Sequence, residues 1–348
     1  MAEHVIVKPG KIAATAAVAL EQSLVVPAIF QREGIDAYKG TENDTINVKV
    51  EGVLPFRTYG WRNDRAAPIQ FDDYAEKTVA VAFGGNTYSA VKMTDEQRDM
   101  DLGGWTKLMA KQVEAIGRGL ERGAVDKMLG QSYAVTLAGA KSGRDLKGIL
   151  IRAREVLTRF MVPREGRVLL VGSAWETALL SDDKLNLASN VGEQEAVSSL
   201  REASLGRRYG FDIVVSLEVP ADAAFALHRS AFIFATGAPT VPSSVTGGTA
   251  SHNGVALRWL QDYDANYLTD RSVVNTYRGF REIKDHLIGI NEGTGQAYVS
   301  THEHFVRAIK LDLDATVDVL PDPDGPDAKA QELAAITGIA GPADGASV

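Results

Sequence analysis

The chain has 348 residues, of which 45% are hydrophobic and 24% charged, and this balance predicts a soluble globular protein with one large domain or two modest ones. It contains no cysteine, which excludes disulfides, thiolate metal sites and cysteine nucleophiles. The net charge of −8 argues against a protein that grips nucleic acid through a basic surface, and no apolar run is long enough to predict a membrane span or a secretory signal.

The first predicted element is a helix from Lys11 to Phe30, in a segment rich in alanine and leucine, which favour helices. Pro27 is expected to break or end it, because proline removes a backbone donor and its ring clashes with the preceding turn. The sequence leaves two interpretations of this segment open: an ordinary surface helix, or an N-terminal arm that lies on a neighbouring subunit.

A long two-stranded excursion is predicted next. Alternating apolar and polar residues mark strands in Thr45–Val53 and Lys77–Val91, with a turn or bulge at Gly84-Gly85. The segment between the strands, from Arg57 to Pro68, is polar and rich in arginine. Because an isolated hairpin is only marginally stable in water, this one is expected to need a partner surface.

The clearest helix follows, and a near match to the capping-box pattern at Thr94–Gln97 opens it. Apolar residues at steps of three and four form one stripe along this helix: Trp105, Leu108, Met109, Val113, Ile116, Leu120, Ala124 and Met128. Gly117, Gly119 and Gly123 interrupt it, and each costs about 1 kcal/mol relative to alanine. Either the helix breaks there, or close approach or bending requires small residues.

The middle of the chain is predicted to be mixed α/β, too irregular for a barrel or a doubly wound sheet. Helices are expected at Asp145–Phe160, Ser173–Leu180 and Glu195–Leu205. Strands are expected at Arg167–Val171, Phe211–Leu217, Ala224–Ala235, Val255–Asp262 and Ser272–Ile283. A stretch rich in Gly, Ser, Thr and Pro is predicted to be a long loop, Thr236–Gly254.

The C-terminal part carries weaker patterns. Residues His304–Val319 alternate well enough for one further strand or a pair of strands. Between Leu320 and Val348 five acids accompany a single base, Lys329, and from Pro321 the chain is rich in Pro, Gly, Ala and Asp. Such a segment buries too little apolar area to offset its ordering entropy, so it is predicted to be a disordered acidic tail.

The sequence contains no catalytic constellation, and no catalytic, cofactor-binding or metal-binding residue is predicted. Ser173 lies in a turn that lacks the second glycine of a nucleophile elbow, and a helix cap explains it better. His302 and His304 would face one side of a strand, but no third metal ligand accompanies them, so they are interpreted as surface histidines. Three acids are spaced as in a calcium-binding loop, but the segment lacks the central glycine of such a loop, so they are interpreted as the solvent-exposed face of a strand: Asp312, Asp314 and Asp318.

An alternating hairpin, a long helix and a mixed α/β domain, in this order, resemble the major capsid proteins of tailed bacteriophages. The resemblance is to the Johnson fold, an α+β fold, and within it to the podovirus coat-protein branch, and it covers about Lys11–Asp285. The segments that carry it are Val48–Val53, Arg57–Trp61, Tyr88–Glu96, Ala226–Phe232, Gly254–Asp264, Asp270–Val274 and Tyr277–Phe280. The chain has no room for the large inserted domain of the branch's typical coat protein, and the extension after Asp285 lies outside the pattern.

The resemblance implies a structural protein, without enzymatic activity or cofactor, that assembles into the pentamers and hexamers of an icosahedral head. This head would enclose double-stranded DNA without specific binding. The implied division is an N-terminal arm (1–40), an extended loop (41–93), a spine helix with a peripheral domain (94–166), an axial domain (167–274), a return with a β extension (275–320) and the tail (321–348). Scaffolding and portal proteins are implied partners, and whether a decoration protein also binds stays open. No membrane is implied. Assembly would take place in the bacterial host cytoplasm, after which the subunit is part of the virion capsid.

The same resemblance makes the extended loop an intersubunit contact, with the predicted contact residues near its tip: Arg57, Tyr59, Trp61, Arg62 and Arg65. Some shells of this fold join a loop lysine covalently to a neighbour's asparagine. No lysine lies between Lys49 and Lys77, and arginine binds carboxylates through paired hydrogen bonds instead. Candidate partners are the acids at the start of the long helix: Asp95, Glu96, Asp99 and Asp101. The expected shell is therefore non-covalent.

Two other functions stay open on the sequence alone. One is a bacterial, cargo-loading protein cage (encapsulin-like) built on the same fold. The other is an unrelated α/β enzyme that uses His302, His304 and nearby acids.

Overall fold

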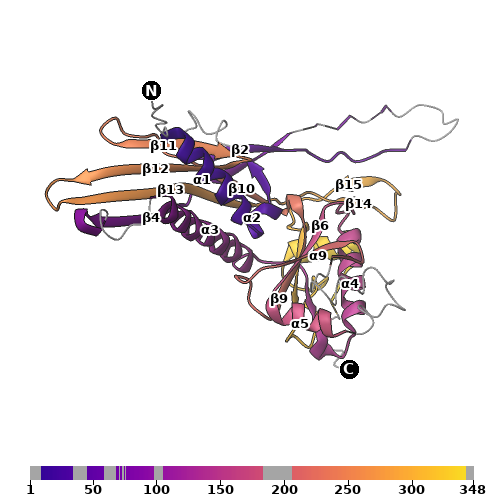
Figure 1. Ribbon diagram of the computed structural model, residues 1–348. Coiled ribbons are helices and arrows are strands. Elements are labelled where there is room, and N and C mark those ends of the chain that lie inside the picture. Colours follow the sequence, from indigo (N-terminus) through magenta and orange to yellow (C-terminus); the bar gives the residue numbers. More distant parts are fainter. Residues whose placement is uncertain are drawn as a thin grey trace. The chain divides into compact units, whose positions relative to one another are not determined.

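The computed structural model describes residues 9–33, 45–58, 68–69, 71–72, 74, 76–97, 105–182 and 206–341 (Figure 1). The chain divides into two compact units, each assembled from separate stretches. Unit 1 comprises Met1–Val48, Ala80–Gln131 and Phe232–Arg281, and Unit 2 comprises Lys49–Val79, Ser132–Ala231 and Glu282–Val348. Within the described ranges, the structure contains no helix that is both long and apolar enough for a membrane span.

Unit 1 combines a sheet of long strands with helices. The strand order is β1-β10-β13-β12-β11, and β4 pairs with β13 outside this path. The strands are β1 (Gln31–Glu33), β4 (Gly85–Thr94), β10 (Phe232–Gly237), β11 (Thr246–His252), β12 (Val255–Asp264) and β13 (Thr269–Glu282). The helices are α1 (Pro9–Ser23), α2 (Val26–Ile29) and α3 (Trp105–Leu129). Helix α1 packs against both β11 and α3, as the ribbon shows (Figure 1).

The predicted break in the N-terminal helix is confirmed, but it lies ahead of Pro27. Helix α1 ends at Ser23, and Pro27 lies in the first turn of α2. The proline ring would clash with the carbonyl four residues earlier, which is that of Ser23, whereas a first turn accepts proline without loss. The amides of Val25 and Val26 donate instead to the buried carboxylate of Glu121 on α3, so the break is closed by a tertiary contact.

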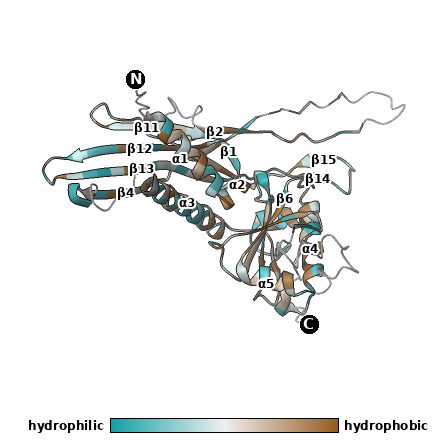
Figure 2. Cartoon of the chain, in the orientation of Figure 1, coloured by the Kyte–Doolittle hydropathy of each residue, from teal (hydrophilic) through white to brown (hydrophobic). Residues whose placement is uncertain are grey.

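The predicted long helix is confirmed over Trp105–Leu129, and the capping box at its predicted start also forms. The amide of Gln97 donates to the hydroxyl of Thr94 at 3.4 Å, and the amide of Thr94 donates to the Gln97 side chain at 3.3 Å. Residues 98–104, between the box and α3, lie outside the described part of the chain. The predicted stripe is buried from Met109 to Met128, and Figure 2 shows hydrophobic and hydrophilic residues along the same helix, as amphipathic packing requires.

The glycines of α3 mark close packing and do not break the helix. A Cβ at Gly117 would lie 2.7 Å from the hydroxyl of Ser23 in α1. A Cβ at Gly119 would lie 2.7 Å from the methyl group of Thr87 in β4, and one at Gly123 would collide with side chains of β13. Of the two alternatives, the need for small residues is therefore confirmed, because the neighbouring elements approach the helix backbone too closely for a side chain.

Unit 2 is built around a mixed sheet with strand order β5-β16-β9-β6-β8-β7. Its strands are β5 (Thr136–Ala138), β6 (Arg167–Val171), β7 (Arg207–Arg208), β8 (Phe211–Val215), β9 (Ala223–His228) and β16 (Ala308–Asp312). A separate pair is formed by β14 (Ile288–Ile290) and β15 (Ala297–Val299). The helices are α4 (Leu146–Arg159), α5 (Ser173–Ser181) and α9 (Ala328–Thr337). All five residues of β6 are buried, because this strand has a partner on each side and lies within the apolar core.

Most of the elements predicted for the middle of the chain are confirmed within a few residues, with one correction at a helix start. Ser173 is the first residue of α5, and Gly172 occupies the cap position without a side-chain hydrogen bond. A Cβ at Gly172 would overlap the carbonyl of Pro220, which explains glycine there and leaves Ser173 no capping role. The predicted helix Glu195–Leu205 lies outside the described residues.

The prediction of a single strand over Ala224–Ala235 is wrong. Strand β9 ends at His228, a 3-10 turn covers Arg229–Ala231, and β10 begins at Phe232. The first strand belongs to the sheet of Unit 2 and the second to that of Unit 1. Both strands are mostly apolar, and composition alone cannot show that the chain leaves one core for another.

The prediction of a long loop over Thr236–Gly254 is also wrong in its second half. Strand β11 pairs antiparallel with β12 in a continuous register from Thr246↔Gln261 to His252↔Val255. Glycine weakens a strand, but the long neighbour supplies the hydrogen bonds. Gly247 is required because a Cβ there would lie 2.5 Å from the carbonyl oxygen of Trp259.

The predicted disorder of the acidic tail is wrong for residues 321–341. Asp327 caps α9 by accepting a hydrogen bond from the amide of Lys329, and Gly338 ends the helix in a left-handed conformation. Leu333 and Ile339 are buried in the core of Unit 2. Burial of these two side chains, with Ile336 packed beside them, therefore holds a segment whose overall composition predicts disorder. Residues 342–348 lie outside the described part.

Candidate assembly surface

The extended loop begins and ends as a two-stranded ribbon, formed by β2 (Thr45–Val50) and β3 (Lys77–Ala82) (Figure 1). The predicted alternation is confirmed, since the apolar side chains that share one face of each strand are buried: Ile46, Val48, Val79 and Val81. Residues 51–58, which follow β2, form no regular strand. Among the described residues, the apolar anchor of the ribbon therefore lies at its base.

Lys77 fixes the base of the loop within Unit 2. Its ammonium group donates to the carbonyl of Lys284 at 3.1 Å and pairs with the carboxylate of Glu303 at 2.6 Å. The hydrogen bond from Lys77 holds the pKa of Glu303 below its ordinary value. The imidazole of His286 lies 3.7 Å from the same carboxylate. The start of β3 is thus tied to the segment that follows β13.

Arg57 is paired within the loop itself. Its guanidinium binds Asp72 through two hydrogen bonds, Nε to Oδ2 at 3.0 Å and Nη2 to Oδ1 at 2.6 Å, which lower the pKa of that carboxyl. The sequence interpretation overlooked Asp72 because it considered only acids near the tip and on the long helix. Among those helix acids, Asp95 accepts a hydrogen bond from Tyr263 in Unit 1 at 2.9 Å. The remaining predicted contact residues lie outside the described part of the chain, as do two of their candidate partners: Tyr59, Trp61, Arg62, Arg65, Asp99 and Asp101.

The described flanks of the loop expose apolar side chains, which the sequence analysis missed. Phe71 is 93% exposed and Leu54 is 48% exposed. The same surface includes further apolar side chains at Val53, Phe56, Ile69 and Tyr74. Burying one such side chain contributes roughly 1.5–3 kcal/mol, so leaving several in water is unfavourable for a subunit on its own. The signal was present in the sequence, because Ile69 and Phe71 are spaced by two and Val53, Leu54 and Phe56 cluster on the other flank.

A hollow of 840 Å³ lies beside the base of the loop, between residues 50–57 and the hairpin β14–β15. In this hairpin the amide of Ser300 donates to the carbonyl of Leu287 on the opposite strand. In an antiparallel pair only every second residue directs its backbone N–H and C=O groups toward the partner strand. Ala297 and Val299 are the alternate residues, so their backbone groups point away from β14. Within the described part of the chain these backbone groups have no hydrogen-bond partner. The hollow is therefore bordered by an open strand edge, which is suited to receive an extended peptide segment.

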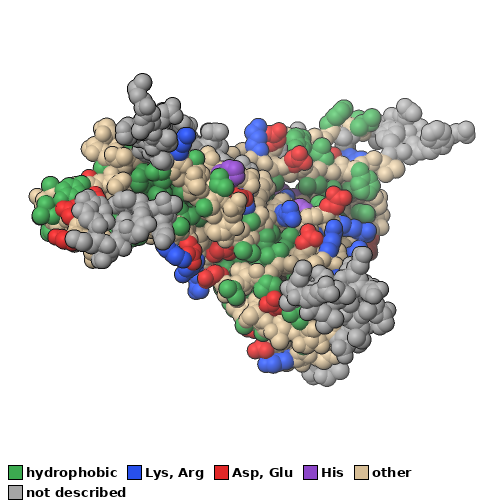
Figure 3. Space-filling model, viewed as in Figure 1, with side chains coloured by type: hydrophobic (Ala, Val, Ile, Leu, Met, Phe, Trp, Pro, Cys, Tyr) green, Lys and Arg blue, Asp and Glu red, His purple; other side chains and the backbone are tan. Residues whose placement is uncertain are grey.

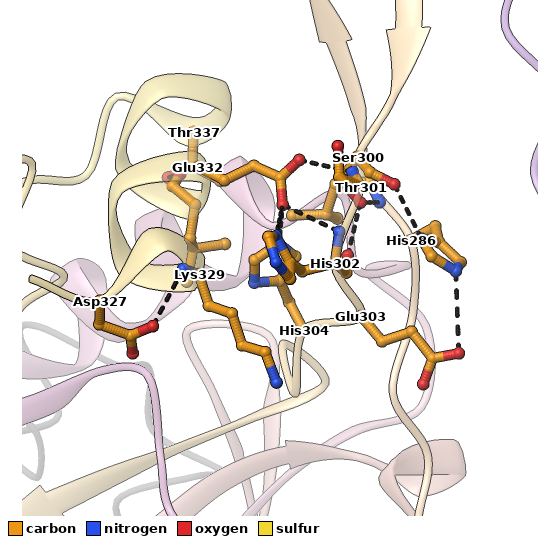
Figure 4. Close-up of polar contacts among 12 residues, drawn as sticks. His286, Ser300, Thr301, His302, Glu303, His304, Asp327, Lys329, Glu332 and Thr337 are labelled. Atoms are coloured by element: carbon orange, nitrogen blue, oxygen red, sulfur yellow. Dashed lines mark hydrogen bonds and ion pairs between the residues drawn. The ribbon is translucent and has the colours of Figure 1, made fainter.

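The His302 and His304 pair is not a pair of surface histidines, and it binds a carboxylate. His304 is 5% exposed, and its Nε2 lies 3.3 Å from Oε2 of Glu332 on α9 (Figure 4). His302 approaches the same oxygen with Nδ1 at 2.9 Å and donates its amide to it at 3.0 Å, while the amide of Thr301 donates to Oε1 at 2.5 Å. No group of side chains in the described ranges could hold a metal ion. The cluster instead fastens the C-terminal helix to residues 300–304.

Replacing Glu332 by glutamine is expected to destabilise the protein by about 1–3 kcal/mol near pH 7, because the amide cannot accept all of these hydrogen bonds as a carboxylate does. Burial acts to raise the pKa of Glu332, but the hydrogen bonds from Thr301, His302 and His304 outweigh it and lower the pKa from 4.5 to about 2. Since the folded pKa lies below the unfolded one, this stabilisation is complete above about pH 4.5 and is lost as the pH falls through about 2. Melting temperatures of both proteins should therefore converge as the pH approaches 2; a constant difference would contradict the assignment.

Comparison with known protein families matches the model described as phage capsid protein over residues 86–331. No curated protein matches the chain in sequence. Solved structures with a similar fold include Mycobacterium phage Che8, with 15% identity, a TM-score of 0.57, and coverage of 83% of this chain and 90% of that chain. The capsid structure of Cyanophage P-SCSP1u follows with 11% identity, a TM-score of 0.55, and coverage of 82% and 86%. The mature capsid of bacteriophage PhiM1 has 11% identity, a TM-score of 0.54, and coverage of 84% and 87%. At such identities the likeness concerns the fold, and it confirms the predicted Johnson fold and its α+β class.

Proposed function

Since the chain belongs to the phage capsid protein family, we propose that its extended loop is the contact by which one subunit of the shell holds the next. The protein is a structural major capsid protein and not an enzyme. Its function is self-association into an icosahedral bacteriophage shell, in which it is part of the virion capsid.

The observation that carries the loop proposal is the apolar surface on the loop flanks. A subunit that exposes Leu54, Phe56, Ile69 and Phe71 gains stability when a second copy covers them. The paired Arg57 and Asp72 would lie in the same contact, where exclusion of water strengthens ion pairs. In a closed symmetric shell each such modest contact is repeated many times, so the sum is large.

The proposed contact residues are Arg57, Tyr59, Trp61, Arg62 and Arg65. Three of these side chains are arginines, which form paired hydrogen bonds with carboxylates, and two are aromatic, which is typical of residues that dominate protein interfaces. The division of the chain into arm, loop, spine helix, peripheral domain and axial domain is part of the same proposal.

The finer identity of the protein is also proposed. The podovirus coat-protein branch is supported by the order of segments such as Tyr88–Glu96 and Gly254–Asp264. We propose scaffolding and portal proteins as partners, with a decoration protein as a further candidate, and assembly in the cytoplasm of the bacterial host. The encapsulin-like cage remains the second candidate, but the phage family match over residues 86–331 favours the phage shell.

Size-exclusion chromatography and negative-stain microscopy of the expressed protein, with and without its scaffolding protein, test the proposed function. We expect capsomers or shells that elute far ahead of a 37.3 kDa monomer, with closed particles in the micrographs. A protein that stays monomeric or forms only a small oligomer under both conditions would contradict it.

The assembled shell is expected to be non-covalent. The lysines nearest the loop tip, Lys49 and Lys77, lie at the loop base and pair with Glu76 and Glu303. Mature particles boiled in denaturing detergent should therefore run as a single band near 37.3 kDa. A ladder of covalent oligomers would refute this expectation, and replacing both lysines by arginine would then show whether they form the link.

A further inference from the structure

Six arginines gather at one end of the Unit 2 sheet, although the chain as a whole carries a net charge of −8. They come from α4, from the start of β6, from β7 and from the turn after β9: Arg154, Arg164, Arg167, Arg207, Arg208 and Arg229. We call them the arginine cluster. The sheet register brings them together, because β6 pairs with both β8 and β9, and β7 pairs with β8. On the face drawn in Figure 3, basic and acidic side chains lie interspersed.

Arg167 is the buried member of the cluster whose hydrogen-bond partners are known. It is fully within the core at 2% exposure, and its guanidinium donates to the carbonyls of Val162 and Pro163 and to the hydroxyl of Thr158. All of these acceptors are neutral, so the positive charge of Arg167 is not cancelled. Burial lowers the pKa of Arg167, and the nearby charge of Arg154 and Arg164 lowers it further, which places both arginines close to it.

Four members of the cluster are exposed: Arg154, Arg164, Arg207 and Arg229. Asp212 is shared by two of them, at 3.7 Å from Arg207 and 3.9 Å from Arg229. Arg154 and Arg164 have no ion-pair partner among the described residues. Among the described residues, and with Arg208 left aside, five arginines face Asp212 and Glu165, so the local balance is about +3.

Two acids that follow β16 already have basic partners in the same chain. Asp314 pairs with Lys141 at 2.8 Å, and Asp318 binds Arg144 at 2.6 Å. Neither of these two carboxylates is therefore available to the arginine cluster of a second copy. A phosphate backbone, in contrast, supplies many closely spaced negative charges, and guanidinium groups match phosphate oxygens with paired hydrogen bonds.

We propose that the arginine cluster is a binding site for the phosphate backbone of double-stranded DNA. The exposed arginines hold phosphates, and the buried charge of Arg167 raises the positive potential behind them. Contacts to phosphate carry no base information, so the binding is independent of sequence. The inference concerns residues of Unit 2 alone and does not depend on how subunits assemble.

The test measures the binding of a labelled DNA duplex to the purified protein by fluorescence anisotropy, between about 50 and about 200 mM salt. With four exposed arginines, log affinity should fall with log salt at a slope of about −3 to −4. The variant Arg154→Gln/Arg164→Gln/Arg229→Gln should have a slope near −1 and bind roughly tenfold or more weakly at the lowest salt. The matched control Lys111→Gln/Arg118→Gln/Arg122→Gln removes the same charge from α3 in Unit 1 and should keep the wild-type slope. Circular-dichroism melting shows that each variant is folded.

Four outcomes would overturn the proposal. The wild-type protein could fail to bind the duplex, or the cluster variant could keep the wild-type slope and affinity. Equal losses in the cluster variant and the α3 control would show a general charge effect without a site. Displacement of DNA by polyglutamate at the same charge concentration would assign the cluster to an acidic protein segment instead of a nucleic acid.

Discussion

Deletion of residues 58–68 is expected to leave a folded subunit that no longer closes into shells. The residues removed lie beyond the described ion pair of Arg57 with Asp72, and the buried anchor of the ribbon, at Ile46 and Val81, stays intact. A change confined to such a surface segment alters stability by about 0.5 kcal/mol or less. Assembly, in contrast, loses the proposed contact in every subunit at once, so the expected loss of closed particles is complete.

Melting curves, size-exclusion chromatography and negative-stain micrographs of the deletion measure both effects. A glycine-serine bridge across the gap keeps the flanks free to pair. A second variant, Leu54→Ser/Phe71→Ser, keeps the length of the loop and removes only apolar contact area, so it should reduce the yield of particles without changing the melting temperature. Normal particles from the deletion would show that the loop tip is not an intersubunit contact.

Truncation after Leu320 is expected to lower the melting temperature by roughly 10 °C or more. The cut removes α9 and with it the buried side chains of Leu333 and Ile339, each of which contributes roughly 1.5–3 kcal/mol. It also removes Glu332, which leaves the amides of Thr301 and His302 and the buried imidazole of His304 without their acceptor. Losses of this size are a large part of the total stability of a protein.

A chain that ends at Gly341 is the matched control, because it keeps every contact described for α9. It should melt like the full-length protein, whereas the chain that ends at Leu320 should melt well below both. Equal melting temperatures for all three chains would show that α9 contributes nothing to stability and that the sequence-based prediction of a disordered tail is adequate.

Local patterns of the sequence determined the elements whose stability depends on near neighbours in the chain. The run Arg167–Val171, apolar after its first residue, is a buried strand at the predicted bounds, and the capping box at Thr94 forms. The apolar stripe of α3 is buried as its spacing of three and four predicted. The order of these elements was also enough to identify the family, because a fold is a sequence of elements and needs no single diagnostic motif.

Only the tertiary structure decided the features that join residues distant in the chain. Strand β11 exists because β12 supplies its hydrogen bonds, and the run Ala224–Ala235 divides between two sheets because each half meets a different core. Helix α9 is held by His302 and His304, about 30 residues away, which the sequence presented only as a histidine pair without a third partner.

The distribution of charge on the surface is also decided by the tertiary structure and not by the sequence alone. The net charge of −8 correctly describes the chain as acidic on average, and on that basis the sequence predicts no grip on nucleic acid. The arginine cluster arises because three strands and α4 bring together arginines from positions 154 to 229, while Glu155, an acidic neighbour of Arg154 in sequence, pairs with Arg152 instead. Periodicity and composition record what a segment prefers by itself, whereas electrostatic potential and strand pairing depend on distances in space, which only the folded chain determines.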